Sequence, residues 1–489
     1  MSRSIKVTTG KFSPQEGGLV LGWSKDLKKI YCNTDDTHSL VIGTTRSGKT
    51  RHLVLQSIGF SAMANESMIV SDPKGELYLF TGPYLKTLGY EVITIDFKNP
   101  ERSNRYNFLQ PVLDAVYMGN LSLAVSSARD IANLLVPDKE NTSTDPLWPN
   151  GERAILTVAI LAVCLEISDP RWQNLDNARH FIGTMCATPS DPKQELPLIA
   201  YLEKLPETSP LRRAMAIAKI SPEKMRGSFY SSGLTTLDLF ADAPIHDMTA
   251  VTDFDHLATG DRKRAIFIIL PDEKSTYYPL ASLFVFQQYQ LLVRRADENG
   301  GRLPRRVEFF LDEFGNFVRV PDMDKAITVG GGRGCRFHLF VQDTTQIYEK
   351  YGEKLGKTMT SNCETWVYLY TKNTDTIQEI GQQLGKYTVK SPSLSASTGG
   401  QSSASYNLTG RDLLTTEEIK RISRPYQLVM GRSDPVMMYA PDISKTFFNT
   451  MFGMGSKRHN QKLQIYRNSL RPSRTPTVSY WDGYKAYTR

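Results

Sequence analysis

A glycine-rich stretch, Gly43-Thr44-Thr45-Arg46-Ser47-Gly48-Lys49-Thr50, has the residue types and spacing for phosphate chemistry. It fits the G-x-x-x-x-G-K-[ST] pattern, in which the glycines let the backbone curl around phosphate oxygens at a helix N-terminus. Lys49 adds a positive charge at the β- and γ-phosphates, and the Thr50 hydroxyl is a ligand for Mg²⁺. We therefore predict a site for a nucleoside triphosphate and Mg²⁺, with contacts from Thr44, Thr45, Arg46, Ser47, Gly48, Lys49 and Thr50.

A carboxylate pair further along the chain could complete a hydrolytic site. The apolar residues 307–311 predict a strand that ends at Asp312-Glu313, and ligands of α/β sheets bind at the carboxyl ends of strands. Asp312 is then placed to hold Mg²⁺, and Glu313 is placed to polarise the attacking water. For an isolated pattern of this kind, a capped strand end is the competing interpretation.

Two later residues are candidates for sensing the γ-phosphate. Arg333 follows three glycines in a predicted flexible loop, from which it could reach a phosphate on an adjacent subunit. Gln342 ends the next predicted strand, 336–342, where an amide could orient the phosphate and the water. A solvated arginine in a glycine turn and a glutamine that satisfies a strand end are the alternatives, and the pattern alone leaves both open.

Apolar runs and helical segments alternate on both sides of a central helical block. Short apolar runs predict strands, and the helical stretches between them favour an α/β fold with a mainly parallel sheet. From residue 121 to 240 the pattern is helical, interrupted by turns such as Pro146-Leu147-Trp148-Pro149. We predict a lead-in at 1–35, a nucleotide-binding domain at 36–120 and 241–455, an inserted all-α domain at 121–240, and a basic, aromatic tail at 456–489.

Composition and charge limit the kinds of site and partner to expect. The five cysteines of the 489 residues are scattered and form no C-x-x-C pair, which argues against a disulfide framework or a zinc site. The net charge of +8 favours a polyanionic partner. Residues 390–405, rich in serine and glycine, are expected to form a mobile loop, with a plain flexible connection as the alternative. The tail suits single-stranded nucleic acid, with a solvated, disordered end as the alternative.

The order of the motifs resembles a known family, the coupling ATPases of bacterial conjugation and type IV secretion, a TraG/TraD-like group of hexameric RecA-like motors. The resemblance covers roughly residues 36–445 and is carried by VIGTTRSGKT, IVSDPKGELY, NRYNFLQP, DPLWPNGERAIL, FFLDEFGNF, VGGGRGCRFHLFVQDTTQIYEKYG, SNCETWVYL and RDLLTTEEI. It implies a RecA-like P-loop domain with an inserted all-α domain. The family's phosphate-binding lysine, metal carboxylate, catalytic glutamate, arginine finger in trans and strand-end glutamine correspond to Lys49, Asp312, Glu313, Arg333 and Gln342.

What the resemblance implies about function is an Mg²⁺-dependent ATPase, stimulated by DNA and by assembly. Such a protein recruits relaxase-bound single-stranded DNA, or a protein substrate, and delivers it to a type IV secretion channel. The implied partners are single-stranded or double-stranded DNA, the relaxase with accessory DNA-processing proteins, channel components and further copies of the chain in a hexamer. The all-α domain is expected to face the cytosol and meet substrate.

The beginning of the chain departs from the family pattern. Family members usually start with two membrane-spanning helices, whereas no apolar segment precedes Gly43 here. A trimmed anchor is the favoured explanation, with a naturally anchorless member as the alternative. The native protein is then expected on the cytoplasmic face of the bacterial cell membrane, and the chain as written is expected to be soluble and to be monomeric without the anchor.

Two other functions compete with the coupling ATPase. An FtsK-like DNA translocase shares the core, but the helical insertion and the SDPKGEL and RDLLTTEEI segments argue against it. A substrate receptor that uses nucleotide only as a switch belongs to a different class. ATP turnover with and without single-stranded DNA separates the motor from the receptor.

Overall fold

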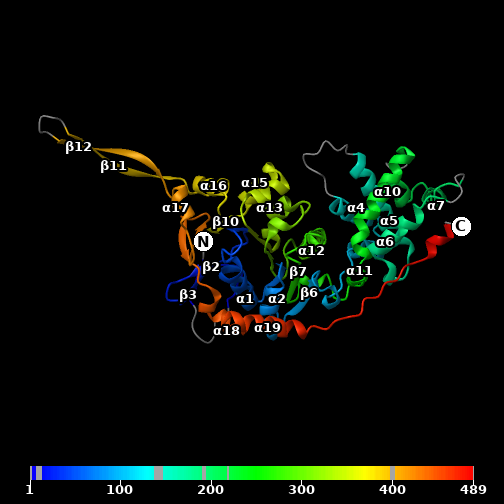
Figure 1. Cartoon of the computed structure of the whole chain (residues 1–489), viewed down its shortest axis with the longest axis horizontal. Coiled ribbons are helices and arrows are strands. Elements are labelled where there is room, and N and C mark those ends of the chain that lie inside the picture. The colour runs from blue at the N-terminus through cyan, green and yellow to red at the C-terminus, as the bar shows by residue number, and fades with distance from the viewer. Residues whose placement is uncertain are drawn as a thin grey trace. The chain divides into compact units, whose positions relative to one another are not determined.

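Two units make up the chain, and each is assembled from three stretches of sequence. The computed structural model describes residues 3–6, 14–136, 147–189, 194–216, 220–396 and 402–487. The first unit comprises residues 1–66, 308–315 and 327–457, and the second comprises residues 67–307, 316–326 and 458–489. Strands and helices occur in both (Figure 1), which confirms the predicted α/β class. These two units do not correspond to the predicted domains and do not test their boundaries, which stay predictions.

The strand that leads into the glycine-rich loop, β4, lies inside the sheet of the first unit, with strands on both sides of it. Its strand order is β1-β3-β2-β14-β13-β10-β4-β9-β8. Strand β4 is parallel to its neighbours β9 and β10, whereas the pairs from β10 through β13 to β1 are antiparallel. β2, β4, β8 and β9 are buried at every position, as apolar strands covered on both faces require. The bounds are β1 Arg3–Lys6, β2 Leu19–Trp23, β3 Lys29–Asn33, β4 Ser39–Gly43, β8 Val307–Leu311, β9 Cys335–Val341, β10 Thr365–Tyr370, β13 Tyr426–Met430 and β14 Val436–Tyr439.

Several helices of the first unit follow the carboxyl ends of its parallel strands β4, β9 and β10. A π-helical turn, η1 (Thr50–Val54), leads directly into α1 (Leu55–Met63) after β4. The others are α13 Met323–Arg333, of which residues 327–333 belong to this unit, α14 Thr345–Tyr351, α15 Glu353–Asn362, α16 Thr374–Leu384, α17 Thr416–Lys420 and α18 Phe447–Met451.

The second unit contains three parallel strands and most of the helices. β7 (Arg264–Ile269) lies between β5 (Ser67–Asp72) and β6 (Glu91–Asp96). A tight turn follows β5, in which the Gly75 N–H donates to Asp72 O at 3.2 Å and α2 begins at Glu76. The helices are α2 Glu76–Thr87, α3 Gln110–Tyr117, α4 Leu121–Leu135, α5 Leu147–Glu166, α6 Leu175–Met185, α7 Pro197–Lys204, α8 Pro210–Ala214, α10 Glu223–Leu237, α11 Ala243–Ala250 and α12 Tyr278–Glu298.

Helix α5 forms the centre of the helical part, where it packs against α4, α6, α8 and α10. By length and composition it could cross a membrane, but 67% of its most apolar window is buried within the fold. The predicted turn at residues 146–149 is wrong from Leu147 onward, because α5 begins there. Proline is tolerated in the first helical turn, where N–H groups lack intrahelical acceptors, and Trp148 packs edge-on against Phe229 with ring centres 5.8 Å apart.

The serine-rich segment expected to be a mobile loop is a β-hairpin instead. β11 (Lys386–Ala396) and β12 (Ser402–Asp412) pair antiparallel in unbroken register, from Lys386 opposite Asp412 to Ala396 opposite Ser402. The hairpin extends away from the sheet of the first unit (Figure 1). A backbone ladder holds it together, which a composition-based prediction does not detect. Residues 397–401, part of the predicted loop, lie outside the described residues.

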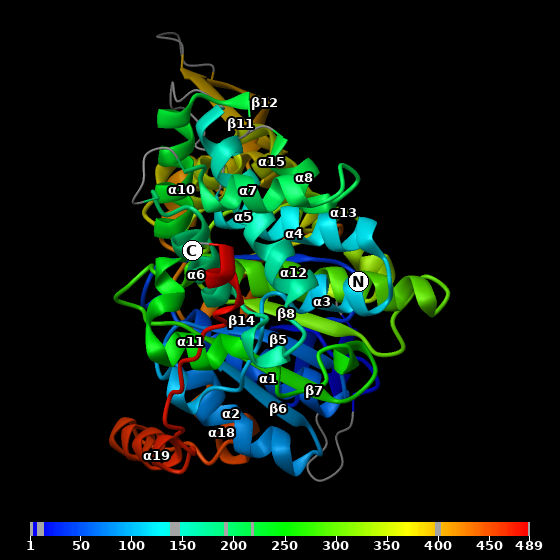
Figure 2. The ribbon, with the colours of Figure 1, turned by 90° about the vertical axis from the view of Figure 1, so that its right-hand side faces the viewer.

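The C-terminal end of the chain crosses the second unit as a folded segment. After α19 (Lys457–Ser469), residues 470–487, which we call the C-terminal strap, run from the vicinity of α2 to that of α6 (Figures 1 and 2). Arg471 forms a buried ion pair of 2.6 Å with Asp96 at the end of β6, and Arg474 lies 3.2 Å from Asp247 on α11. The alternative of a solvated, disordered end is therefore wrong for the strap.

The far end of the strap inserts an aromatic side chain between helices. Tyr484 is 1% exposed, and its ring packs edge-on against Phe181 of α6 with centres 4.7 Å apart. Trp481 donates its backbone N–H to the Asn177 side chain at 2.9 Å. The strap therefore fastens the edge of the three-stranded sheet to the helical part of the same unit, and its arginines are occupied by acidic partners within the fold.

Candidate active site

The glycine-rich loop leaves the buried strand β4 and closes on itself within a few residues. Ser47 donates its backbone N–H to Thr44 O at 3.0 Å. A Cβ placed on Gly43 would lie 2.5 Å from Ser47 Oγ, so a larger residue here would displace the Ser47 side chain. Gly48 has φ of 102° and Arg46 has φ of 67°. A left-handed arginine is strained, and such strain is typical of functional loops.

The loop presents backbone donors that have no acceptor in the described part of the chain. The Thr44 N–H is used by Tyr370 O at 2.9 Å, but the N–H groups of Thr45, Arg46, Gly48 and Lys49 donate to none of the described residues. Ser47 Oγ is buried and likewise has no partner among them. A concave run of free N–H groups at a helix N-terminus attracts anions. The loop is thus built as the predicted phosphate cradle would be.

Lys49 is buried and points across the loop toward the neighbouring strands. Its side chain is 5% exposed, and Nζ donates to Gly43 O at 2.6 Å and to Glu313 Oε1 at 3.3 Å. A buried ammonium group needs such partners, because losing its hydration is costly. The ion pair joins the predicted phosphate-binding residue to the predicted catalytic carboxylate.

The end of β8 is shaped so that its two carboxylates take different positions. Asp312 is 6% exposed, and its Oδ1 accepts the Glu313 N–H at 3.1 Å. Glu313 has φ of 51°, a left-handed conformation that is costly for a non-glycine residue. Gln342, after β9, donates from Nε2 to Glu313 Oε2 at 3.2 Å. Four predicted residues from three strand ends are thus gathered at one place: Lys49, Asp312, Glu313 and Gln342.

Contacts that the sequence did not reveal hold the helix behind the loop. Arg51 donates from Nε and from Nη2 to the two Asp442 oxygens, each at 2.7 Å. Partial burial acts to raise the pKa of Asp442, but bonds from Arg51 and from Ser444 outweigh it and hold that pKa well below its usual range. His52 Nδ1 bonds to Ala440 O at 2.6 Å. These pairs connect positions almost four hundred residues apart, so local pattern could not predict them.

Arg333 was predicted to lie in a flexible loop. It is instead the last residue of a helix. Gly330 to Arg333 form the last turn of α13, and Gly334, with φ of 89°, terminates it. A Cβ on Gly331 would lie 2.2 Å from Asp36 O, so glycine is required for the close approach of this helix to the backbone before β4. Arg333 is half-buried at the beginning of β9, at the opposite end of that strand from Gln342.

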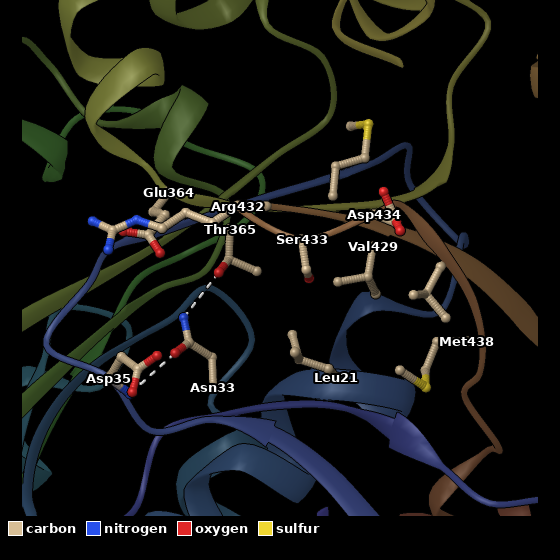
Figure 3. Close-up of a pocket in the computed structure, with 13 residues that line it drawn as sticks. Leu21, Asn33, Asp35, Glu364, Thr365, Val429, Arg432, Ser433, Asp434 and Met438 are labelled. Carbon is tan, nitrogen blue, oxygen red and sulfur yellow. Dashed lines mark hydrogen bonds and ion pairs between the residues drawn. The ribbon is translucent and has the colours of Figure 1, made fainter. Parts of the chain in front are cut away.

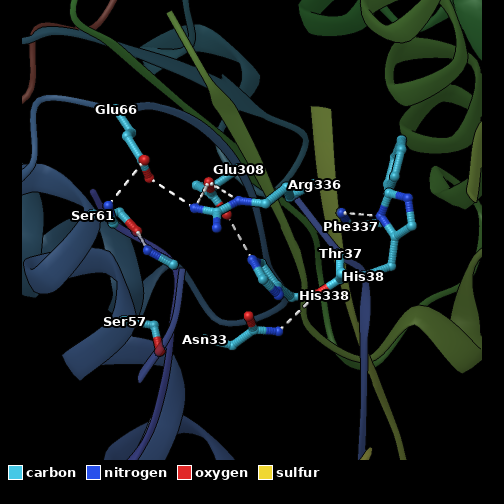
Figure 4. A network of polar contacts seen from close by, with 12 residues as sticks. Asn33, Thr37, His38, Ser57, Ser61, Glu66, Glu308, Arg336, Phe337 and His338 are labelled. Atoms are coloured by element: carbon cyan, nitrogen blue, oxygen red, sulfur yellow. Dashed lines mark hydrogen bonds and ion pairs between the residues drawn. The ribbon is translucent and has the colours of Figure 1, made fainter. Parts of the chain in front are cut away.

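A buried group of charges occupies the other end of the same strands (Figure 4). Arg336 on β9 donates from Nε to Glu308 at 2.7 Å and from Nη2 to Glu66 at 3.0 Å, and His338 lies 2.6 Å from Glu308. Burial, reinforced by the charge of Glu308, raises the pKa of Glu66 to about 7, and burial lowers the pKa of His338. Because the group lies away from the loop, we interpret it as structural.

A pocket in the first unit also lies away from the loop. Its lining includes Asn33 and Thr365, joined by a hydrogen bond of 2.9 Å, and Arg432, which pairs with Glu364 at 2.9 Å (Figure 3). Thr365 begins β10, whereas the glycine-rich loop follows the last residue of β4, which is parallel to β10. The pocket is therefore not part of the Lys49 site.

The fold and this site define an α/β protein whose phosphate-binding loop faces a glutamate and a glutamine from neighbouring strand ends. The chain belongs to the family described as type IV secretory system conjugative DNA transfer, which it matches over residues 4–439.

Curated relatives are VirD4 proteins. Protein VirD4 of Rhizobium rhizogenes is 24% identical over 431 residues, covering 86% of this chain and 61% of that protein. Protein VirD4 of Rhizobium radiobacter is 25% identical over 437 residues, covering 86% and 60%. The type IV secretion system-coupling protein VirD4 of Bartonella quintana is 22% identical over 311 residues, covering 62% and 47%. This chain therefore spans 60–61% of the length of the two Rhizobium proteins.

Solved structures of the plasmid coupling protein TrwB have the same fold. The unbound bacterial conjugative coupling protein TrwBdeltaN70 aligns with a TM-score of 0.65 at 17% identity, covering 90% of this chain and 93% of that one. TrwB in complex with ADP and Mg²⁺ aligns with a TM-score of 0.62 at 16% identity, with coverage of 90% and 93%. The likeness confirms the predicted fold, a RecA-like α/β core.

Proposed function

We propose that this chain hydrolyses ATP with Mg²⁺ and is the coupling protein that passes relaxase-bound single-stranded DNA, or a protein substrate, to a type IV secretion channel. The observation that carries the proposal is the Glu313 carboxylate, which contacts both Lys49 Nζ at 3.3 Å and Gln342 Nε2 at 3.2 Å. Membership of the conjugative DNA transfer family supports it. TrwB has been solved with the ATP analogue ADPNP, and with ADP and Mg²⁺, which also supports it.

Each residue of the site has a role that its surroundings suit. The free N–H groups of the loop and Lys49 bind the β- and γ-phosphates. Glu313 accepts hydrogen bonds and can polarise the attacking water, while Gln342 holds the Glu313 carboxylate in position. The Thr50 hydroxyl and the Asp312 carboxylate are hard oxygen donors, which fit Mg²⁺. When bound, Mg²⁺ neutralises charge on the phosphates during transfer.

We propose that Arg333 acts on the nucleotide of a neighbouring copy. β9 separates Arg333 from Gln342, and its seven residues span about 20 Å at the usual rise of a strand. Arg333 is therefore too distant from the Lys49 site of its own chain. A head-to-tail contact between copies brings one surface against a different surface of the next copy, and such contacts close into rings. A homo-hexamer fits this arrangement, and ATP turnover then depends on assembly.

We propose that residues 121–240 meet the substrate, that the relaxase, accessory DNA-processing proteins and channel components are partners, and that the protein works at the cytoplasmic face of the cell membrane. The net charge of +8 suits a nucleic-acid cargo. Stimulation of ATP turnover by DNA is part of the same proposal.

Steady-state ATP turnover with and without single-stranded DNA tests this function. The wild type is expected to turn over ATP faster with DNA, and Glu313→Gln is expected to lose about 10²- to 10⁴-fold in rate while it still binds ATP. Glu349→Gln is the matched control, because Glu349 is exposed on α14. ATP binding without turnover by the wild type under every DNA condition would instead support a nucleotide-switched receptor, and stimulation by naked duplex alone would support an FtsK-like translocase.

A further inference from the structure

Arg424 lies beside the phosphate-binding loop although the two are far apart in sequence. A Cβ placed on Gly48 would be 3.2 Å from Arg424 Cδ. The pairing of the strands explains this approach. Gly43 at the end of β4 is level with Tyr370 at the end of β10, and β10 runs antiparallel to β13, with Tyr368 opposite Leu428. The residues before β13 therefore lie at the edge of the sheet where the loop begins.

The flank on which Arg424 lies is opposite to the hydrolytic residues. β4 has β9 on one side and β10 on the other. Glu313 and Gln342 follow β8 and β9, whereas Arg424 precedes β13, beyond β10. A nucleotide whose terminal phosphates face Glu313 must extend its base and ribose away from that side. The β10–β13 flank is the direction that remains.

The Arg424 guanidinium is available for a ligand. Arg424 is exposed, and its side chain makes no hydrogen bond or ion pair with any of the described residues. Arg51, by contrast, is fixed by two hydrogen bonds from its guanidinium to the Asp442 carboxylate. Tyr426, two residues from Arg424, is 37% exposed, and its ring lies 5.9 Å from that of Tyr439. The flank thus offers the planar cation of Arg424 and an exposed aromatic ring.

We propose that Arg424 binds the base of the nucleoside triphosphate, with its guanidinium stacked on the purine ring, while the loop and Lys49 bind the phosphates. The proposal rests on the nucleotide binding of the proposed function and adds the base-binding side of the same site. Guanidinium is planar and weakly hydrated, and it stacks on aromatic faces better than an ammonium group does. Because every purine has such a face, this contact strengthens binding without selecting adenine over guanine.

Equilibrium binding of ATP and of inorganic tripolyphosphate separates a base contact from a phosphate contact. For Arg424→Ala, the ATP affinity is expected to fall about 5- to 30-fold, the range from an exposed to a desolvated cation–π contact. Tripolyphosphate has no base, so its affinity is expected to stay at the wild-type level. Arg424→Lys keeps the charge without the planar group, and its ATP affinity is expected to fall nearly as far as that of Arg424→Ala.

Arg432→Ala is the matched control, because Arg432 is 82% exposed and lies after the opposite end of β13. Its ATP affinity is expected to be that of the wild type. Equal losses of ATP and tripolyphosphate affinity in Arg424→Ala would overturn the base contact in favour of a phosphate contact, and unchanged ATP affinity would overturn any contact. Failure of the wild type to bind ATP would overturn the proposed function as well, so the two failures are distinguishable.

Discussion

Lys49 Nζ lies 3.3 Å from Glu313 Oε1, so the cation expected to bind phosphate is paired with the carboxylate expected to activate water. Gln342 holds the other oxygen of the same carboxylate at 3.2 Å. The left-handed backbone of Glu313, with φ of 51°, turns its side chain into this position. Phosphate oxygens that reach Lys49 must therefore compete with Glu313, which links binding to the position of the catalytic group.

Neutralising Glu313 is expected to tighten nucleotide binding. In Glu313→Gln, Lys49 loses its anionic partner, and no carboxylate at this position repels the phosphates. The pair is partly exposed, so about 1 kcal/mol, or roughly a fivefold lower Kd for a non-hydrolysable ATP analogue, is expected. Titration calorimetry measures it. An unchanged or higher Kd for Glu313→Gln, with Glu349→Gln at the wild-type value, would mean that the ion pair does not oppose binding.

Alanine substitutions at two adjacent glycines of α13 are expected to change the unfolding free energy in opposite directions. At Gly331 a Cβ would lie 2.2 Å from Asp36 O, so Gly331→Ala must push two backbones apart and is expected to lose about 1–3 kcal/mol of unfolding free energy. At Gly332 a Cβ meets nothing within 4 Å, and Gly332→Ala is expected to gain up to about 1 kcal/mol from helix propensity. Denaturant unfolding compares them. Equal changes in unfolding free energy for the two variants would indicate a loop at residues 330–332, which is what three consecutive glycines suggest.

The sequence predicted which residues meet at the end of the loop, namely Lys49, Asp312, Glu313 and Gln342, because the loop and the strand ends have local patterns. The predicted bounds of β8 agree with the structure, since a short, mostly apolar run that ends at a carboxylate pair defines this strand. Arg333 was misplaced because the helix that contains it depends on the contact between Gly331 and Asp36 O. The hairpin of β11 and β12 was missed because its register comes from backbone pairing rather than from apolar alternation.

Contacts between segments that are distant in the sequence could not be predicted from local patterns. β13 and β14 were not predicted, and the place of Arg424 beside Gly48 depends on the antiparallel pairing of β10 with β13. The strap was predicted as basic and aromatic, but that composition does not distinguish a DNA contact from the buried pair of Arg471 with Asp96. In each case the missing information is which distant segments are neighbours.

His38 is expected to make folding sensitive to acid. It is 4% exposed and accepts the Phe337 N–H at Nδ1, and burial, with the nearby charges of His338 and Arg336, lowers its pKa from 6.5 to about 4. The folded state keeps His38 neutral while the unfolded chain takes up a proton. Its contribution to stability is thus complete above pH 6.5 and is lost as the pH falls toward 4. The expected loss is about 3 kcal/mol.

Denaturant unfolding of His38→Asn between pH 7 and pH 4.5 checks this expectation, since the asparagine oxygen can accept the same N–H. The variant is expected to lose less stability than the wild type as the pH falls. Glu66, whose raised pKa acts in the opposite direction over this range, is present in both proteins, so the difference isolates His38. His459→Asn alters an exposed histidine and serves as the control. Parallel pH profiles for wild type and His38→Asn would contradict the account.

The strap is expected to stabilise the second unit and to leave DNA binding to other residues. Arg471→Ala leaves Asp96 buried without its cation and is expected to cost about 3–5 kcal/mol in unfolding free energy, whereas Arg171→Ala, at an exposed pair, changes little. Below the unfolding temperature, DNA affinity of Arg471→Ala is expected to be unchanged.

Exposed cations on α19 provide the contrasting variant. The triple change Lys457→Gln, Arg458→Gln and Lys462→Gln leaves the strap intact, and all three side chains are exposed. If α19 binds the DNA backbone, the slope of log affinity against log salt falls by about 2–3. An unchanged slope would remove α19 from the DNA-binding surface, and loss of DNA affinity in folded Arg471→Ala would contradict the structural role of the strap.

ATP turnover by mixed variants tests most directly the central claim, that two copies of this chain build each hydrolytic site. Lys49→Ala and Arg333→Ala are each expected to be inactive with DNA present. In an equimolar mixture, an intact loop meets an intact Arg333 at about one interface in four, so turnover is expected to recover to about a quarter of the wild-type value. Mixed oligomers that form, as co-purification of differently tagged copies detects, and yet stay inactive would contradict the claim.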